Sequence, residues 1–303
     1  MTDTPVIRTR GLSKRYRGTD ALVDLDLEVA PGEVVGYLGP NGAGKTTTIR
    51  LLLGLIRPTS GTAQLFGLDS LQDAVAVHRR LAYVSGEPAL WPNLTGAEVL
   101  HLLGQVQGSV DLVYRDDLVD RFALDPSKKV RAYSKGNRQK VVLIAALASR
   151  PDLLILDEPT AGLDPLMAHE FRSCVLEAKG RGQTVFLSSH LLSEVEALCD
   201  QVGVLRDGRL IEMGTLAAMR HLSAVTVEVS FEGDAPDLSA VDGVLSATAN
   251  GRHASLQVRG SMDPLLQVLA GSHVRQLRSR DPSLDELFLT LYGDVGATSP
   301  RAG

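Results

Sequence analysis

The segment from Gly39 to Thr46 carries the clearest chemistry in this chain of 303 residues. It reads Gly-Pro-Asn-Gly-Ala-Gly-Lys-Thr, which fits the pattern of a phosphate-binding loop. Glycines let the backbone curl so that successive N–H groups point at phosphate oxygens. Lys45 would bring a positive charge to the β and γ phosphates, and Thr46 a hydroxyl to Mg²⁺. The predicted nucleotide contacts are Gly39, Pro40, Asn41, Gly42, Ala43, Gly44, Lys45, Thr46 and Thr47.

The segments on either side of the loop are of the kinds that a phosphate site needs. Residues 33–38 predict a short buried strand, and residues 46–55 predict a helix. The N-terminal end of that helix would direct its partial positive charge at a bound anion. A glycine-rich turn can match the loop pattern by accident, but the flanking strand and helix favour nucleotide binding.

Two acids follow a second apolar segment. Residues 153–156 predict a strand, and Asp157 and Glu158 stand at its end. Asp157 is placed to hold Mg²⁺, directly or through water. Glu158, one residue further on, is placed to polarise a water molecule for attack on the γ-phosphate. Acids in an ordinary turn are the alternative, and the phosphate loop makes that alternative minor.

A third segment, residues 133–140, joins a small residue and a glycine to a strong helix pattern. The N-terminus of such a helix can bind an anion through its free backbone N–H groups. A plain helix cap made by Ser134 explains the same residues equally well.

The composition limits the classes of function. A net charge of −5 and an isoelectric point near 5.8 argue against a nucleic-acid partner. The two cysteines, Cys174 and Cys199, are too few for a disulfide framework and lack metal-site spacing. The longest apolar run, residues 141–148, is far short of a membrane span. If the protein works at a membrane, we expect another chain to cross it.

The order of the remaining patterns predicts an α/β fold followed by a smaller α+β unit. Strand patterns at 153–156, 184–188 and 201–205 alternate with helices, which is typical of a parallel sheet covered on both faces. Further strands are expected at 6–9, 21–29, 62–66, 81–84, 224–231, 253–259 and 273–278, and later helices at 263–270 and 282–292. We expect domains at 1–220, with a helical insert at about 94–149, and at 221–295, and a disordered tail at 296–303.

Taken together, the motifs identify a family. The phosphate loop, Ser134-Lys135-Gly136-Asn137, Leu156-Asp157-Glu158-Pro159-Thr160, Gly162-Leu163-Asp164 and His190 occur in the order that resembles the ATP-binding subunit of ABC transporters. The resemblance covers about residues 6–214. It implies a P-loop NTPase core of RecA-like type with an N-terminal antiparallel β region, and an ATPase that uses ATP and Mg²⁺.

The resemblance also implies roles for individual residues. Ser134 and Gly136 would contact the γ-phosphate held by the other subunit of a dimer. Asp164 would communicate across that dimer. His190 would sense the γ-phosphate beside the catalytic Glu158. Tyr16 would stack on adenine, and the alternative for Tyr16 is a core or surface aromatic residue near a strand.

The chain departs from the family pattern in its signature motif, which usually reads Leu-Ser-Gly-Gly-Gln. Tyr133 replaces the Leu, Lys135 the first Gly and Asn137 the Gln. Because Ser134 and Gly136 remain, we expect the phosphate contact to survive, with Lys135 among the nucleotide-contacting residues.

A sharper departure follows the strand at 81–84. The family usually has a Gln there, which helps with Mg²⁺ or water and senses the membrane partner, and this chain has Gly86. We hypothesise that Glu87 or Ser85 partly substitutes, or that Mg²⁺ relies on Thr46, Asp157 and water.

Within the family, the signature variant and the C-terminal segment 282–288 resemble the daunorubicin-resistance branch, which is paired with ABC-2 permeases. This implies an ATPase on the cytoplasmic face of the cell membrane that powers export of a drug, antibiotic or other hydrophobic compound. Since both halves of the site are intact in one chain, a homodimer is favoured. The transported compound cannot be read from these residues.

Two alternatives stay open at this point. An importer ATPase has the same core motifs, although the C-terminal unit and the signature variant argue against it. Soluble ABC proteins that act on ribosomes carry two ATP-binding domains, and this chain has one phosphate loop. Those that act on DNA carry a long coiled coil, and the stretch from Lys45 to Asp157 has no heptad repeat.

Overall fold

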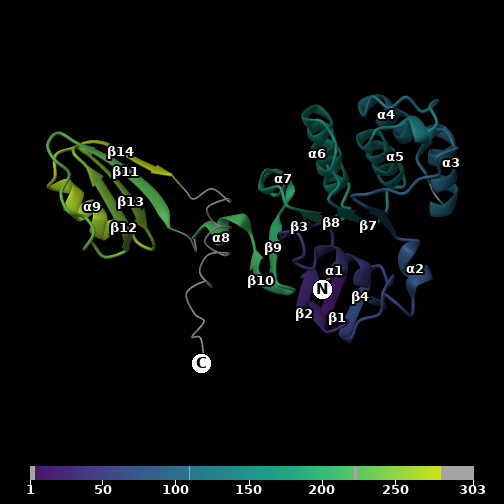
Figure 1. The fold of residues 1–303 in the computed structure, drawn as a ribbon, viewed down its shortest axis with the longest axis horizontal. Helices are drawn as coiled ribbons and strands as arrows, with labels where there is room; N and C mark the ends of the chain where they lie inside the picture. The colour runs from purple at the N-terminus through teal and green to yellow at the C-terminus, as the bar shows by residue number, and fades with distance from the viewer. Residues whose placement is uncertain (1–3, 109, 222–223, 281–303) are drawn as a thin grey trace. The chain divides into compact units, whose positions relative to one another are not determined.

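A computed structural model describes residues 4–108, 110–221 and 224–280. The chain divides into two compact units between Met213 and Gly214, and each unit is described by itself. Figure 1 shows the elements of both units.

The first unit is built on a sheet of six strands whose order is β10-β9-β3-β8-β7-β6. Four neighbouring pairs, β9 with β3, β3 with β8, β8 with β7 and β7 with β6, are parallel. The strands are β3 (Val34–Leu38), β6 (Leu81–Val84), β7 (Leu153–Asp157), β8 (Thr184–Ser189), β9 (Gln201–Arg206) and β10 (Arg209–Gly214).

The central strands are buried on both faces, as the sequence predicts. In β7, Leu154 and Leu156 face one apolar cluster, whereas Leu153 and Ile155 face another. Successive side chains of a strand point to opposite faces, so a continuous apolar strand serves two cores at once. One cluster contains buried residues of the helices above the sheet in Figure 1, and the other contains those of the region below it.

The region below the sheet contains a four-stranded antiparallel sheet of order β2-β1-β4-β5. The sequence predicts a strand at 6–9, whereas β1 continues to Tyr16. Register shifts after Thr9 and Leu12 break the alternation of apolar and polar residues, so the sequence pattern ends before the strand does. The elements are β1 (Ile7–Tyr16), β2 (Thr19–Val29), α1 (Lys45–Leu52), β4 (Ser60–Leu65), β5 (Leu68–Asp69) and α2 (Ala74–His78).

The stretch predicted to be a helical insert is helical. Thr95 and Glu98 form a capping box at the start of its first helix, which satisfies backbone N–H groups that the helix leaves free. The helices are α3 (Gly96–Gln107), α4 (Leu112–Arg121), the short 3-10 helix η1 (Val130–Ala132) and α5 (Lys135–Ala148). Two further helices, α6 (Pro165–Gly180) and α7 (Leu192–Leu198), follow β7 and β8.

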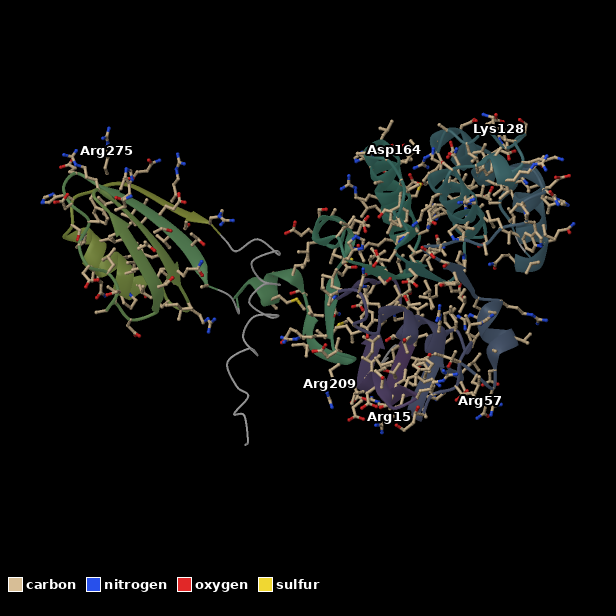
Figure 2. All side chains as sticks on the ribbon, viewed as in Figure 1. Arg15, Arg57, Lys128, Asp164, Arg209 and Arg275 are labelled. Atoms are coloured by element: carbon tan, nitrogen blue, oxygen red, sulfur yellow. The ribbon has the colours of Figure 1, made fainter. Side chains whose placement is uncertain are left out.

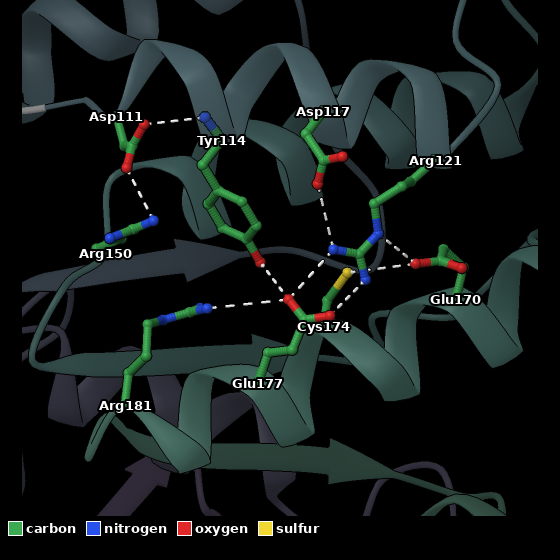
Figure 3. Close-up of polar contacts among 9 residues, drawn as sticks. All are labelled: Asp111, Tyr114, Asp117, Arg121, Arg150, Glu170, Cys174, Glu177 and Arg181. Carbon is green, nitrogen blue, oxygen red and sulfur yellow. Dashed lines mark hydrogen bonds and ion pairs between the residues drawn. The ribbon is translucent and has the colours of Figure 1, made fainter.

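A cluster of charged residues joins α4 of the insert to α6 of the core (Figure 3). The Arg121 guanidinium donates to Glu170 at 2.6 Å and to Glu177 at 2.7 Å. These hydrogen bonds raise the pKa of Arg121 and lower the pKa of the Glu177 carboxyl. Tyr114 also donates to Glu177, at 3.2 Å. Burial raises the pKa of the neighbouring Cys174 thiol to about 12, which keeps it neutral and suits a structural role.

The second unit has one sheet, of order β12-β13-β11-β14, with antiparallel pairs throughout. Its core includes Val227, Leu256 and Leu265. The sequence analysis does not predict β12. Leu245, Ala247 and Ala249 do alternate with polar residues, but two of the three are small and this edge strand is mostly exposed. The elements are α8 (Leu216–His221), β11 (Val225–Phe231), β12 (Val244–Asn250), β13 (His253–Val258), α9 (Asp263–Ala270) and β14 (Val274–Arg280). The helix predicted at 282–292 and the tail at 296–303 lie outside the described residues.

We predict that Arg121→Met destabilises the first unit by about 2 kcal/mol, between the values typical of exposed and buried ion pairs. The variant keeps an apolar side chain of similar length but leaves Glu170 and Glu177 without their shared cation. Because the folded-state pKa of Glu177 is lowered, this contribution is present at neutral pH and is lost as pH falls through that pKa. Urea unfolding of the full chain at neutral and acid pH measures it.

Lys128→Met is the matched control, because Lys128 (labelled in Figure 2) pairs with Asp125 on the surface, where both side chains are about half exposed. An exposed pair contributes little to stability. Equal destabilisation by the two variants would contradict a special role for Arg121.

Candidate functional site

A cavity of about 590 Å³ lies where the phosphate loop meets the ends of the central strands. It brings together residues that are far apart in the sequence. From the predicted site it is lined by Pro40, Asn41, Gly42, Gly44, Lys45, Thr46, Thr47, Lys135, Asp157, Glu158 and His190. Ser85, Gly86 and Glu87 line it too, together with Ala21, Arg50 and Ala161.

The phosphate loop joins the end of β3 to the start of α1. Gly44 is the N-cap of α1 and has a φ of 109°, a conformation that only glycine adopts freely. Lys45 is only 6% exposed, and its ammonium donates to the carbonyl of Gly39 at 2.5 Å and of Pro40 at 3.3 Å. The same ammonium lies 3.5 Å from Glu158 Oε1. The positive charge is thus fixed between the loop and the second motif.

Oxygen atoms suited to a hard cation meet on the side of α1 nearest β7. Thr46 Oγ1 donates to Asp157 Oδ2 at 3.1 Å, and Ser188 Oγ donates to Asp157 Oδ1 at 2.5 Å. Mg²⁺ binds through one or two protein oxygens and completes its shell with water and phosphate oxygens. Thr46 and Asp157 therefore fit that ion, and Ser188 fixes the orientation of the carboxylate.

Glu158 and His190 form a pair above the ends of two adjacent strands. Glu158 follows β7 and His190 follows β8, and because these strands are parallel neighbours both residues emerge at the same edge. His190 Nδ1 and Glu158 Oε2 are in hydrogen-bond contact. The backbone N–H of Glu158 donates to Ser188 O at 3.1 Å, and Glu158 adopts a left-handed conformation with φ of 50°. A non-glycine residue in this conformation is strained and persists only where its surroundings hold it.

Comparison with known proteins decides the family. Residues 22–161 match the family described as ABC transporter. A daunorubicin resistance ATP-binding protein, DrrA3 of Streptomyces coeruleorubidus, is 38% identical over 97% of this chain and 98% of its own length. The chain belongs to the ABC transporter ATP-binding family. It is therefore an ATP-hydrolysing cassette, and its P-loop NTPase fold with an antiparallel N-terminal sheet is as predicted.

Two further similarities extend this result. A fluoroquinolones export ATP-binding protein of Mycobacterium tuberculosis is 32% identical over 96% of this chain and 94% of its own length. A solved ATP-binding subunit of an ABC transporter superposes with a TM-score of 0.66 at 33% identity, over 71% of this chain and 92% of the other. The match to full-length relatives thus includes the second unit as well as the cassette.

Gly86, which stands where the family usually has a Gln, lies against the two acids at the end of β7. A β-carbon at position 86 would lie 3.0 Å from the carbonyl oxygen of Asp157 and 3.0 Å from Glu158 Cβ. The chain therefore runs unusually close to both acids, and a side chain there would press on them. Glu87 is exposed and lies 3.9 Å from the ammonium of Lys135, whereas the buried Gln139 donates to Ser85 O at 3.2 Å.

The signature residues hold the start of α5 in place. Ser134 is the N-cap and accepts from the backbone N–H of Asn137 at 3.2 Å, so it makes the helix cap that the sequence offered as the alternative, and its phosphate contact stays a prediction. Tyr133, which replaces the usual Leu, is buried, and its hydroxyl donates to the carbonyl of Asp125 at 2.6 Å. At Gly136 a β-carbon would lie 2.3 Å from Gly162 O, so only glycine fits. Ser134 and Gly136 do not line the cavity.

Asp164 and Tyr16 also lie outside the cavity lining. Asp164, labelled in Figure 2, caps α6 and accepts from the N–H of Met167 at 2.9 Å. Tyr16 ends β1 opposite Thr19, is 42% exposed, and has the Lys14 ammonium 5.0 Å from its ring centroid. The dimer role of Asp164 and the adenine role of Tyr16 stay predictions.

Sequence reasoning missed two polar residues at the site. Ser188 is fully buried beside Asp157, and the exposed Arg50 of α1 lines the cavity. Ser188 is one of two serines that follow the apolar residues Val185 to Leu187 and end the strand directly before His190. Polar residues at the end of a buried strand are the signal that could have identified Ser188.

We predict that Gly86→Gln, which restores the residue usual in the family, lowers turnover rather than raising it. A β-carbon at 86 would displace Asp157 and Glu158, and displacement of catalytic groups costs on the order of 10-fold or more in rate. Steady-state ATP hydrolysis by the purified chain measures the effect, and Gly86→Ala shows whether the β-carbon alone suffices. A Gly86→Gln variant that is faster than the parent protein would refute this account.

Proposed function

We propose that this ATPase powers export of a drug, antibiotic or other hydrophobic compound through a separate ABC-2 type permease. The observation that carries the proposal is the extent of the similarity. The daunorubicin resistance and fluoroquinolones export proteins match at least 96% of this chain, which includes the second unit and not only the motifs that all cassettes share. This extent favours export over import. We place the protein on the cytoplasmic face of the membrane, held there by its permease.

Within the described part of the chain, no helix combines the length and hydropathy that crossing a membrane requires.

A second cavity, of about 250 Å³, is suited to the permease. Its lining is largely apolar and includes Pro88, Leu90 and Trp91 from the segment after β6, and Leu103 and Val106 from α3. Trp91 is 50% exposed and Val106 is 78% exposed, as expected of an apolar surface that meets a partner. Our proposal is that a cytoplasmic helix of the permease docks here.

The permease cavity and the nucleotide cavity share Ser85. If the permease displaced the segment from Ser85 to Pro88, the shape of the nucleotide cavity would therefore change, and a bound nucleotide that displaced it would change the permease cavity. Gly86 packs against the backbone of Asp157 within this segment, so the segment connects the permease side of the cassette to the hydrolytic acids. This is the route by which nucleotide binding would bias the permease.

Two copies of the chain would form the working dimer. Ser134, Gly136 and Asp164 do not line the cavity of their own subunit, whereas an exposed N-capped helix start is free to meet the phosphates of a second one. In this arrangement each phosphate loop faces the partner's α5, and ATP closes the dimer. Lys135 lines the cavity of its own subunit, so its contact with nucleotide would not need the partner.

The hydrolytic chemistry follows from the positions of the side chains. The loop N–H groups and Lys45 would hold the β and γ phosphates, and His190 would contact the γ-phosphate. Thr46 and Asp157 would hold Mg²⁺, which neutralises phosphate charge when bound. Glu158 would accept a hydrogen bond from a water molecule whose oxygen attacks the γ-phosphorus, while the bond to the bridging β–γ oxygen breaks. The products are ADP and phosphate, and their release would reopen the dimer.

We predict that Glu158→Gln binds ATP and dimerises but loses turnover by about 100-fold or more, because a neutral amide no longer polarises the attacking water. The side chain keeps its size, so Lys45 and the phosphate loop should hold nucleotide as before. ATP hydrolysis, ATP affinity by calorimetry and mass by light scattering measure the three properties. Normal hydrolysis by this variant would remove Glu158 from its proposed role.

We predict that Glu87→Ala lowers the Mg²⁺-dependent activity by about 3-fold or less, since Glu87 is exposed and its ion pair with Lys135 is weak. The measurement is the ATPase rate against Mg²⁺ concentration, with the permease present. A large loss, together with a raised Mg²⁺ requirement, would show instead that Glu87 replaces the Gln that is usual at position 86.

A further inference from the structure

The carboxylate of Glu194 is buried on α7, outside the cavity that holds the other acids. Glu194 is 5% exposed. Its Oε1 accepts a hydrogen bond from Thr160 Oγ1, and its Oε2 accepts one from Ser189 Oγ at 2.7 Å. Each oxygen of the carboxylate therefore accepts a hydrogen bond from a different hydroxyl. Thr160 lies in the loop after β7, and Ser189 lies at the end of β8.

The two hydroxyls belong to the backbone segments that carry the proposed hydrolytic pair. Thr160 is two residues after Glu158, in a turn closed by a hydrogen bond from the N–H of Ala161 to Glu158 O at 3.1 Å. Ser189 is the last residue of β8 and directly precedes His190. Ser189 Oγ also accepts from the N–H of Leu191 at 2.9 Å, so the serine fixes the backbone on both sides of His190.

Packing alone does not require an acid at this position of α7. Val195 and Leu198, both buried, already provide apolar contacts of this helix with the sheet. Burying a carboxylate is costly unless hydrogen bonds compensate it. A charged acceptor makes hydrogen bonds roughly twice as strong as a neutral one. The residue thus does what an apolar residue cannot do, which is to tie two loops together.

We propose that Glu194 is a positioning residue of the hydrolytic site, which sets the separation and orientation of Glu158 and His190. The inference rests on the function proposed above for that pair. Glu194 lies outside the cavity and binds the backbone segments that carry the pair. It holds Thr160, which follows Glu158, and Ser189, which precedes His190. The left-handed backbone of Glu158 needs such support, because strained residues persist only where the surroundings hold them.

The test compares Glu194→Gln and Glu194→Ala in the purified full-length chain. We expect kcat for ATP to fall by about 10-fold or more in the alanine variant and less in the glutamine variant, whose amide oxygen still accepts one hydrogen bond. The affinity for ATP should stay within about 2-fold of the parent, since the hydrogen bonds of Glu194 go to Thr160 and Ser189 rather than to Lys45 or the phosphate loop. Glu196→Ala, an exposed acid on the same helix, is the matched control and should retain the parent rate.

Thr160→Val supplies a readout that a merely structural role would not move. If Glu194 acts through Thr160, the rates of the single and double variants will be non-additive, because the second substitution removes a bond already lost. Unchanged kcat in both Glu194 variants, or strictly additive effects with Thr160→Val, would overturn the proposal. An equal loss of kcat and ATP affinity that follows a lowered melting temperature would also overturn it.

The glutamine variant of Glu158 separates this inference from the function on which it rests. If Glu158→Gln still hydrolyses ATP, the proposed function fails. If Glu158→Gln is inactive while the Glu194 variants keep the parent rate, only the positioning role fails.

Discussion

The central constraint on this molecule is that its parallel strands are covered on both faces. Residues inside β7 and β8 must then be apolar on each side, so side chains that do chemistry are confined to the strand ends. Asp157, Ser188 and His190 are all found there. In the register between β7 and β8, Asp157 lies opposite Ser188. This register brings the carboxylate of Asp157, the hydroxyl of Ser188 and the imidazole of His190 to the same carboxyl-terminal edge of the sheet. The phosphate loop joins them because β3 is the other neighbour of β8.

Charge at the site is arranged around one buried cation. Lys45 is held by loop carbonyls and by Glu158, so a nucleotide phosphate that takes Lys45 as its partner competes with Glu158 for the ammonium. Such a competition would release Glu158 toward water when the γ-phosphate is in place. His190, which also contacts Glu158, would limit how far the freed carboxylate can turn. Positioning and activation of the acid would thus depend on the same few contacts.

The sequence was sufficient for the parts of the site that are local. A phosphate loop, an apolar strand with acids at its end and a capped helix are all encoded within short segments, and the two-faced burial of the strands follows from their composition. Interactions between distant segments were not predictable in this way. The Arg121 cluster, the bond of Ser188 to Asp157 and the contact of Gln139 with Ser85 each depend on how helices and strands meet, and residue types alone do not reveal it. The edge strand β12 was missed because its alternating residues are mostly small and exposed, which makes the strand pattern weak.

The contact between Gly136 and Gly162 has a mechanical consequence. Two side chains in contact can take up a shift of several tenths of an ångström by changing rotamers, whereas two backbones cannot. Gly136 leaves no space for even a methyl group against the Gly162 carbonyl, so a movement of the start of α5 toward Gly162 would have to displace the segment that leads into Asp164. Direct contact between the two backbones would thus couple these segments without any ligand bridging them.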